Sequence, residues 1–340
     1  MRQVIMTSPG KIELREVTSP GKLAPNEILL KIKRIGVCGS DIHVYHGEHP
    51  FTPYPVVQGH EYSATVEAVG SVVTKVNPGD YATARPQLVC GECRPCRRGD
   101  YNVCESLRVQ GFQAPGCAQD YFVVPEERII PFPKKMTFEQ GAMIEPASVG
   151  AHSTSRVSDL KNKNVVVFGA GTIGNMVAQF VQARGAKKVL ITDLSEFRLE
   201  KAKACGILNT SNAKNEEFPI AIKRVFGDEG FQVAIEAVGV EPTITAAVKH
   251  IEKGGEIIIL GVFGFPPKID LSVVCEHEIK LIGSMMYKHE DYKEAVKLIS
   301  TGKIKTEPLV TRHFPLEHYD EAYKFIDAQG EKTMKVMIDL

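Results

Sequence analysis

The sequence has no excess charge of either sign, because its 340 residues include 41 Lys+Arg and 41 Asp+Glu. Proteins that bind nucleic acid or anionic membranes through their charge need a positive field, so both functions are disfavoured. No stretch reaches the roughly eighteen uninterrupted apolar residues of a membrane-spanning helix. The start, MRQVIMTSPGK, lacks the apolar core of a signal peptide. We therefore expect a cytoplasmic protein with no membrane or nucleic-acid partner.

Internal repeats and low-complexity tracts are also missing, and the length suits two domains. Up to about residue 140, β-branched runs such as EILLKIKRIGV alternate with Gly and Pro, which predicts a β-rich region. From about residue 162, short apolar runs such as NVVVF and EIIIL alternate with helical segments, which is typical of a parallel sheet covered on both faces. We predict an α/β protein in which residues 1–149 and 285–340 form a β-rich domain and residues 150–284 form an inserted, doubly wound domain.

A glycine-rich turn follows the first apolar strand of the inserted domain. Gly169, Gly171 and Gly174 form G-x-G-x-x-G between this strand and a helix, and Asp193 ends the next strand. This order is typical of dinucleotide binding, in which the helix N-terminus faces the pyrophosphate and the carboxylate binds the ribose of NAD. A strand–turn–helix with an N-cap aspartate is the alternative. Arg198 could stack on the adenine or lie in solvent on its helix.

Four cysteines fall within fifteen residues: Cys90, Cys93, Cys96 and Cys104. Their spacing lets one short lobe wrap four thiolates around zinc, which leaves no open coordination position. Iron–sulfur ligation is the alternative, but ferredoxin-type runs have three residues before the fourth cysteine and then a proline. Here seven residues precede it and Glu105 follows. A redox C-x-x-C pair would need only two cysteines. The pattern predicts a closed, structural zinc site.

A second group of ligand-type residues is dispersed: Cys38 in GVCGSDIH, His60 and Glu61 in GHEY, and Glu145 in MIEPASVGAH. One thiolate, one imidazole and one or two carboxylates suit a zinc ion that keeps an exchangeable position. An ion in such a site polarises a bound alcohol or water. Spacing alone equally allows a buried free cysteine, a core histidine and surface acids.

Taken in order, these motifs resemble the zinc-dependent medium-chain dehydrogenase/reductase family. The resemblance covers essentially the whole chain: GVCGSDIH, GHEYSATVEAVG, the four-cysteine lobe, MIEPASVGAH and VVVFGAGTIG. It is greatest to the polyol (sorbitol-type) and sugar-acid dehydrogenases, because Glu61 and Glu145 are both glutamates. The resemblance implies a GroES-like catalytic domain, a Rossmann domain, NAD, one catalytic and one structural zinc ion per chain, and a homodimer or homotetramer.

By position, the resemblance makes Cys38 and His60 ligands of the catalytic zinc. Glu61 and Glu145 would be its carboxylate members, without a decision on which of the two binds directly. Ser40 and His43 would pass the alcohol proton toward solvent. An alternative for Ser40 and its neighbour Asp41 is a helix N-cap.

The resemblance also places two loops, 260–262 and 285–287, at the nicotinamide end of the cofactor. Together with the glycine turn they give the expected cofactor contacts: Gly169, Gly171, Ile173, Gly174, Asp193, Arg198, Leu260, Gly261, Val262, Met285, Met286 and Tyr287. Tyr45 and Tyr287 fall near the expected substrate pocket. Met286 is a departure, because sorbitol-type enzymes tend to have an arginine there that holds a substrate hydroxyl.

We therefore expect an enzyme that oxidises a secondary alcohol of a polyol or sugar acid to the ketone with NAD. Three alternatives remain open: L-threonine 3-dehydrogenase-like activity, a general alcohol dehydrogenase, and an NAD-binding regulator with a vestigial site. A nucleic-acid-binding zinc ribbon is disfavoured, because Arg94, Arg97 and Arg98 are too few for the phosphate contacts it would need.

Overall fold

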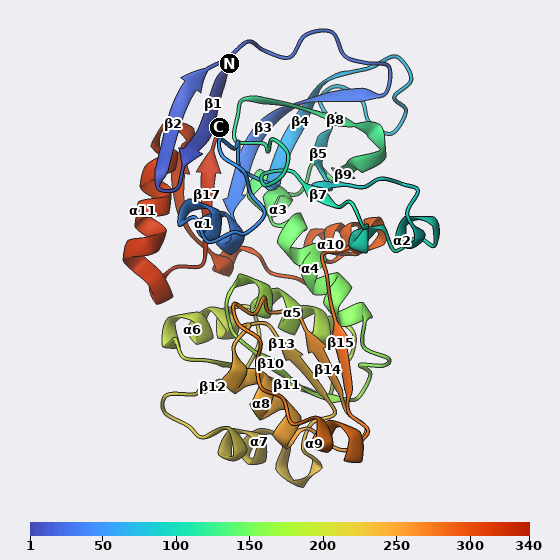
Figure 1. The fold of residues 1–340 in the computed structure, drawn as a ribbon, viewed down its shortest axis with the longest axis vertical. Helices are drawn as coiled ribbons and strands as arrows, with labels where there is room; N and C mark the ends of the chain where they lie inside the picture. Colours follow the sequence, from blue (N-terminus) through green and yellow to red (C-terminus); the bar gives the residue numbers. More distant parts are fainter. The chain divides into compact units, whose positions relative to one another are not determined.

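A computed structural model describes residues 1–340. The β-rich region and the region of alternating strands and helices fold into two compact units. The first unit comprises Met1–Glu145, Lys288–Ser300 and Val310–Leu340, and the second comprises Pro146–Tyr287 and Thr301–Leu309. Figure 1 shows that both chain ends belong to the first unit. None of the helices is long and apolar enough to span a bilayer.

The first unit is built on a mainly antiparallel sheet of seven strands. Their order is β16-β17-β3-β4-β5-β9. Strand β8 pairs with the first half of β3, and β17 pairs with its last four residues. The strands are β3 (Glu27–Val37), β4 (Glu61–Val69), β5 (Tyr81–Ala84), β8 (Tyr121–Pro125), β9 (Ile129–Phe132), β16 (Val310–Pro315) and β17 (Lys335–Asp339). Alternate residues of β3, Ile28, Leu30 and Ile32, are buried in the core, as expected for a sheet with one covered face.

Shorter elements complete this unit. Two separate antiparallel pairs are β1 (Arg2–Ser8) with β2 (Lys11–Glu16), and β6 (Gln87–Leu88) with β7 (Arg108–Val109). Its helices are α1 (Gly39–Tyr45), α2 (Arg94–Arg97), α3 (Phe138–Ala142), α10 (His289–Ser300) and α11 (Tyr319–Gln329). Its 3-10 turns are η1 (Tyr101–Val103), η2 (Glu126–Arg128), η5 (Leu316–His318) and η6 (Gly330–Lys332).

The second unit contains a six-stranded, fully parallel sheet in the order β12-β11-β10-β13-β14-β15. The strands are β10 (Asn164–Phe168), β11 (Lys188–Asp193), β12 (Asn209–Asn212), β13 (Val233–Glu236), β14 (Glu256–Ile259) and β15 (Lys280–Gly283). The strand order reverses between β10 and β13, and ligands bind at such switch points, beyond the carboxyl ends of the strands.

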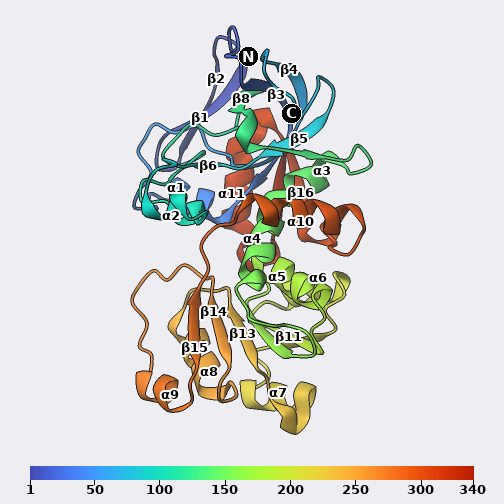
Figure 2. The ribbon, with the colours of Figure 1, turned by 90° about the vertical axis from the view of Figure 1, so that its right-hand side faces the viewer.

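Helices cover both faces of this parallel sheet (Figure 2). They are α5 (Thr172–Ala183), α6 (Glu196–Ala204), α7 (Phe218–Phe226), α8 (Glu241–His250) and α9 (Leu271–Glu276), with 3-10 turns η3 (Gly227–Glu229) and η4 (Glu307–Leu309). Helix α4 (Ile144–Ser155) begins in the first unit and packs on α5, where a Cβ on Gly150 would lie 2.9 Å from Phe180 Cδ2. Val165 and Val167 of β10 pack with α5 and α6, while Val166 and Phe168 pack with α7 and α8. Such two-sided burial explains the uninterrupted apolar run of this strand.

The unit boundaries differ from those expected in one respect. Residues 301–309 were assigned to the β-rich domain, but the structure places Thr301–Leu309 in the second unit. The Gln179 side chain of α5 donates to the Lys305 carbonyl at 3.1 Å and accepts from the Lys305 N–H at 2.7 Å. The next residue, Thr306, is fully buried. These contacts anchor a segment whose composition resembles the rest of the C-terminal region. The other two boundaries fall a few residues away from positions 149 and 285.

Candidate functional site

Cys38 lies where strand β3 ends and helix α1 begins. It is the N-cap residue of α1, and its backbone N–H donates to Asp41 Oδ2 at 2.9 Å, so a carboxylate in the first turn fixes the cap. The thiol therefore sits on a rigid junction between two elements. The alternative noted for Asp41 is confirmed in part, because its side chain does cap this helix.

His60 and Glu61 stand at the start of β4, both almost fully buried. Their ligand atoms and the Cys38 sulfur all lie within 4.8 Å of one another. Donors around a tetrahedral zinc ion are separated by about 3.3–3.8 Å, as follows from metal–ligand bonds of about 2.0–2.3 Å. The three side chains therefore need to close by only about an ångström to share an ion. A thiolate, an imidazole and a carboxylate are donors that suit zinc.

Asp41 has a second contact that sequence reasoning missed. Its side chain is fully buried, and Oδ1 lies 3.5 Å from His60 Nδ1. Neither of these two buried atoms has another hydrogen-bond partner. Burial opposes a charge on His60, but Asp41 and Cys38 raise its pKa well above its ordinary value. With Nδ1 facing Asp41, Nε2 is left for a metal, which is how carboxylates commonly orient zinc-binding histidines.

Lys335 of β17 also reaches this set, and no motif pointed to it. Its Nζ donates to Glu61 Oε1 at 2.8 Å, to Oε2 at 2.5 Å and to the Val37 carbonyl at 2.9 Å. Burial disfavours the ammonium, but Glu61, Cys38 and Glu145 together raise the pKa of Lys335. The signal available in the sequence was a lysine at the start of the largely apolar strand KVMID. The first four residues of this strand are buried, Lys335 included.

The remaining predicted members of the site lie nearby on α1 and α4. Ser40 and His43 are three positions apart on α1, so they project from the same side of the helix. His43 is exposed, with Nδ1 3.0 Å from Glu48 Oε2. Glu145 is buried on α4 but is not one of the three residues whose ligand atoms meet. Tyr45 packs in the core against Tyr323, with ring centroids 5.3 Å apart, which gives it a structural role.

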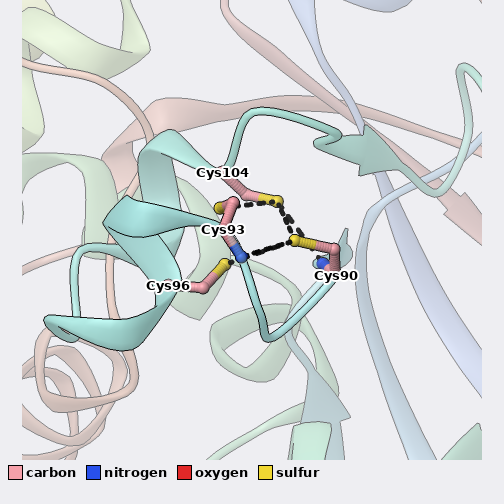
Figure 3. Close-up of side chains that lie close together, drawn as sticks. All are labelled: Cys90, Cys93, Cys96 and Cys104. Atoms are coloured by element: carbon pink, nitrogen blue, oxygen red, sulfur yellow. Dashed lines mark hydrogen bonds between the residues drawn. The ribbon is translucent and has the colours of Figure 1, made fainter.

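The four cysteines of residues 90–104, here called the four-cysteine lobe, converge as predicted (Figure 3). The sulfur–sulfur distances are 3.6 Å for Cys90–Cys104, 3.9 Å for Cys93–Cys104 and 4.0 Å for Cys90–Cys96. Four sulfurs about 2.3 Å from one tetrahedral zinc ion would be about 3.8 Å apart. An iron–sulfur cluster spreads its four cysteines over two or four irons, so they cannot all lie this close together, and the geometry favours a single ion in a closed zinc site.

The local chemistry of the lobe also calls for a cation. Backbone N–H groups of Glu105 and Cys96 lower the pKa of Cys93 to about 6. Burial and the neighbouring Cys93 raise the pKa of Cys96 to about 12, because adjacent thiolates repel one another. A zinc ion would remove this repulsion and hold all four groups deprotonated.

In the second unit, Gly169 and Gly174 occupy positions that other residues fill only with strain, whereas Gly171 lies beside open space. Gly169 has φ +93°, and a Cβ on Gly174 would lie 1.8 Å from the Gly169 carbonyl oxygen. Gly171 is the N-cap of α5, and a Cβ there would meet nothing within 4 Å. The backbone thus packs tightly at two glycines and faces open space at the third. A pyrophosphate fits such a space at a helix N-terminus.

Asp193 ends β11 and contacts this turn directly. Its Oδ2 accepts from the Ala170 N–H at 2.7 Å and its Oδ1 from the Ser195 N–H at 2.8 Å. Each carboxylate oxygen has a further lone pair, so the side chain can hold the turn and still accept from ribose hydroxyls. Arg198, on the first turn of α6, is half-buried and its Nε has no partner. It is therefore not simply a solvated helix residue.

The other predicted cofactor contacts lie in the first turn of α5 and in the segments that follow β14 and β15. Ile173 and Leu260 are partly buried against the core of this unit, whereas Val262 is 91% exposed. Met285 is half-exposed, Tyr287 is buried, and Met286 has φ +49°. Gly261 packs against the Gly239 backbone, where a Cβ would come within 2.2 Å of the amide nitrogen.

Glu236 is a further residue of this edge that the motifs did not reveal. It is fully buried at the end of β13 and accepts from the Val238 and Gly239 N–H groups and from Thr243 Oγ1. A Cβ on Gly261 would lie 2.5 Å from Glu236 Oε2. One carboxylate thus organises the loop after β13 and lies against the loop after β14.

Comparisons with known proteins agree with this arrangement. Residues 24–134 match the model of the alcohol dehydrogenase GroES-like domain, and residues 172–301 match that of zinc-binding dehydrogenases. The chain is 32% identical to sorbitol dehydrogenase 2 of Saccharomyces cerevisiae, over 98% of its own length and 97% of that protein. It is 29% identical to L-threonine 3-dehydrogenase of Rhizobium etli, over 100% and 99%. A zinc-binding dehydrogenase of Sinorhizobium meliloti crystallised with NADP is 27% identical, with a TM-score of 0.91 over 100% of this chain and 99% of that one.

Proposed function

The chain belongs to the zinc-dependent medium-chain dehydrogenase/reductase family, and we propose that it oxidises a secondary alcohol of a polyol or sugar acid to the ketone with NAD. The observation that carries this proposal is the convergence of Cys38, His60 and Glu61 within 4.8 Å. The sorbitol dehydrogenase relative supports the polyol class. Glu61 supports it as well, because it gives the metal set a carboxylate.

Bound zinc would supply a Lewis acid for the alcohol oxygen, and bound NAD would supply the hydride acceptor. Cys38, His60 and Glu61 would hold the metal, and Asp41 would orient His60. Oxidation removes a hydride from the carbinol carbon and a proton from the hydroxyl. Ser40 would take up that proton and pass it toward His43, which is exposed and can release it to water.

Asp193 supports NAD over NADP, because a carboxylate beside the ribose repels a 2′-phosphate. Arg198 provides the counter-argument, since a guanidinium in this region accommodates that phosphate. The proposal predicts a higher kcat/KM with NAD than with NADP, and a smaller ratio in Asp193→Asn. A higher kcat/KM with NADP would refute the cofactor assignment without affecting the metal site.

L-Threonine is the second candidate substrate, favoured by the full-length relative from Rhizobium etli. Met286 bears on the choice, because its side chain cannot hold a substrate hydroxyl as an arginine would. A panel of sugar alcohols, aldonic acids, L-threonine and simple alcohols, assayed by NADH formation, separates the two. Turnover of L-threonine alone would overturn the polyol assignment.

The metal assignment is tested by His60→Ala, with His313→Ala as the control. His313 binds Asp339 and Glu139 in the same unit and lies outside the metal set. We expect His60→Ala to lose one of two zinc ions and nearly all turnover, and the control to keep both. Binding of dinucleotide by wild-type protein that turns over no alcohol would instead favour an NAD-binding regulator.

We also propose a homodimer or homotetramer that works in the cytoplasm. Strand β15 is the last strand of the parallel sheet, so one of its edges is unpaired, and Phe265 and Leu271 are exposed in the same unit. Unpaired sheet edges and exposed apolar side chains both favour association. All eight cysteines are free, as a reducing compartment would keep them. Light scattering of the purified protein tests the oligomer, because a monomeric mass would contradict it.

A further inference from the structure

The four-cysteine lobe contacts the beginning of α10, far along the chain (Figure 1). Asp100, the N-cap residue of η1 in this lobe, accepts from Lys288 Nζ at 2.7 Å and from Arg98 Nε at 2.6 Å. These two hydrogen bonds, with Lys288 the stronger, lower the pKa of Asp100 to about 2. The carboxylate is therefore ionised at any pH at which the protein works.

Tyr101 makes the second contact. Its hydroxyl accepts from the backbone N–H of His289, the first residue of α10, at 2.6 Å. The Arg85 guanidinium lies 4.9 Å from the centre of the tyrosine ring, which holds the ring in place. On α10 itself, Asp291 accepts from the Lys288 N–H at 2.6 Å. Residues 288 and 289 are thus bound at three points within the first unit.

These two residues follow directly on the segment 285–287, after which the chain leaves the second unit for the first. The segment contains Met286 at φ +49°, a conformation that few residues other than glycine adopt. At its other end, the Ser284 N–H donates to the Ile259 carbonyl at 3.0 Å, which fixes it to β14. Strained backbone of this kind persists only when the residues on both sides are held.

We propose that Asp100 and Tyr101 are positioning residues for the segment 285–287, so that the four-cysteine lobe sets the affinity for the dinucleotide. The inference rests on the proposed function, which assigns this segment to the nicotinamide end of the cofactor. None of the lobe's cysteines belongs to the Cys38–His60–Glu61 set. The lobe would act through the backbone of Lys288 and His289, which it holds without touching the reacting groups.

The test uses the full chain with zinc bound. Tyr101→Phe removes only the hydroxyl that binds His289, and Lys288→Met removes the one of the two partners of Asp100 that lies next to α10. Lys288→Arg, which can still pair with Asp100, is the conservative variant. Arg97→Ala is the matched control, because Arg97 lies in the same lobe and is exposed.

Three quantities are measured: the Kd for NADH by fluorescence, amide exchange over residues 285–290, and zinc content. We expect Tyr101→Phe and Lys288→Met each to raise the Kd about two- to tenfold, as loss of one hydrogen bond implies. Exchange at residues 285–289 should accelerate while both zinc ions are retained. Lys288→Arg and Arg97→Ala should match the wild type, and the alcohol KM should change less than the Kd for NADH.

Two outcomes separate the inference from the proposed function. Wild-type protein that binds NADH, with an unchanged Kd in both Tyr101→Phe and Lys288→Met, would overturn the inference alone. Wild-type protein that binds no dinucleotide would overturn the proposed function and the inference together. Loss of zinc from Tyr101→Phe would show a merely structural role for the tyrosine, and Lys288→Met would then decide the question.

Discussion

The ion pair between Lys335 and Glu61 gives a quantitative prediction, because both side chains are almost completely withdrawn from water (4% and 1% exposed). All three N–H donors of the ammonium are used, two by Glu61 and one by Val37. Lys335→Met keeps a chain of similar length and removes the charge. In the zinc-free protein this variant leaves the Glu61 carboxylate buried without a cation.

The expected cost follows from that burial. Removing one partner of a buried ion pair destabilises a protein by about 3–5 kcal/mol. For a unit of this size, each kcal/mol lowers the melting temperature by about 2–4 °C, so Tm should fall by roughly 6–20 °C. Zinc held by Cys38, His60 and Glu61 would restore a positive charge beside the carboxylate. The loss in Tm should therefore be smaller with zinc than with a chelator.

Calorimetry of the variant and the wild type, each with chelator and with zinc, measures both effects. Lys11→Met is the control, because Lys11 forms an exposed pair with Glu13 in the same unit (66% and 47% exposed), and such pairs contribute little. An unchanged Tm in Lys335→Met with chelator would refute the stabilising role of the pair. An equal loss with and without zinc would refute the placement of the ion beside Glu61.

Three further predictions address other parts of the molecule. Gly174→Ala places a methyl group 1.8 Å from the Gly169 oxygen and should lower the Tm of the second unit. Gly171→Ala meets nothing within 4 Å, so it should keep the Tm but weaken NADH binding in a fluorescence titration. Asp41→Asn should weaken zinc at the Cys38 site about 10–100-fold, measured by chelator competition, and leave the lobe's zinc in place. Because the pKa of Asp100 is lowered from 3.8 to about 2, its bonds stabilise the fold above pH 3.8 and are lost only as the pH falls through about 2. From pH 5 to 8 the Asp100 carboxylate therefore stays ionised, and the difference in Tm between the wild type and Lys288→Met, measured by calorimetry, should stay constant.

The features predicted correctly from the sequence have partners close together in the chain. The glycine turn spans six residues and the four-cysteine lobe fifteen, so their spacing alone limits the geometry. The parallel sheet could also be predicted, because an uninterrupted apolar strand such as NVVVF indicates a sheet that is covered on both faces. The fold class and the family, together with zinc and a nicotinamide dinucleotide as cofactors, are confirmed by the family models and the relatives.

The features that were missed depend on contacts distant in sequence. Lys335 and Glu61 are 274 positions apart, and Gln179 and Lys305 are 126 apart. Neither pair belongs to a local motif. Because the contact between Gln179 and Lys305 could not be predicted, residues 301–309 were assigned to the first unit, whereas the structure has them in the second. Asp41 could be seen as a helix cap, but its second contact, to His60, depends on how β4 packs beside α1. Sequence spacing carries no information about such a meeting.

The register of three neighbouring strands brings the metal set together, and Gly36 is the residue that makes this possible. Glu61 on β4 is paired with Gly36 on β3, and Val336 on β17 is paired with Val37. Lys335 therefore reaches Glu61 from two strands away, across a position with no side chain. A Cβ on Gly36 would lie 2.4 Å from Glu61 Oε2 and 3.2 Å from Lys335 Cδ, so any larger residue would push the ion pair apart. Because a slip of one residue turns every side chain of a strand to the other face, the same register that buries Val336 and Ile338 in the core also determines where Lys335 meets Glu61.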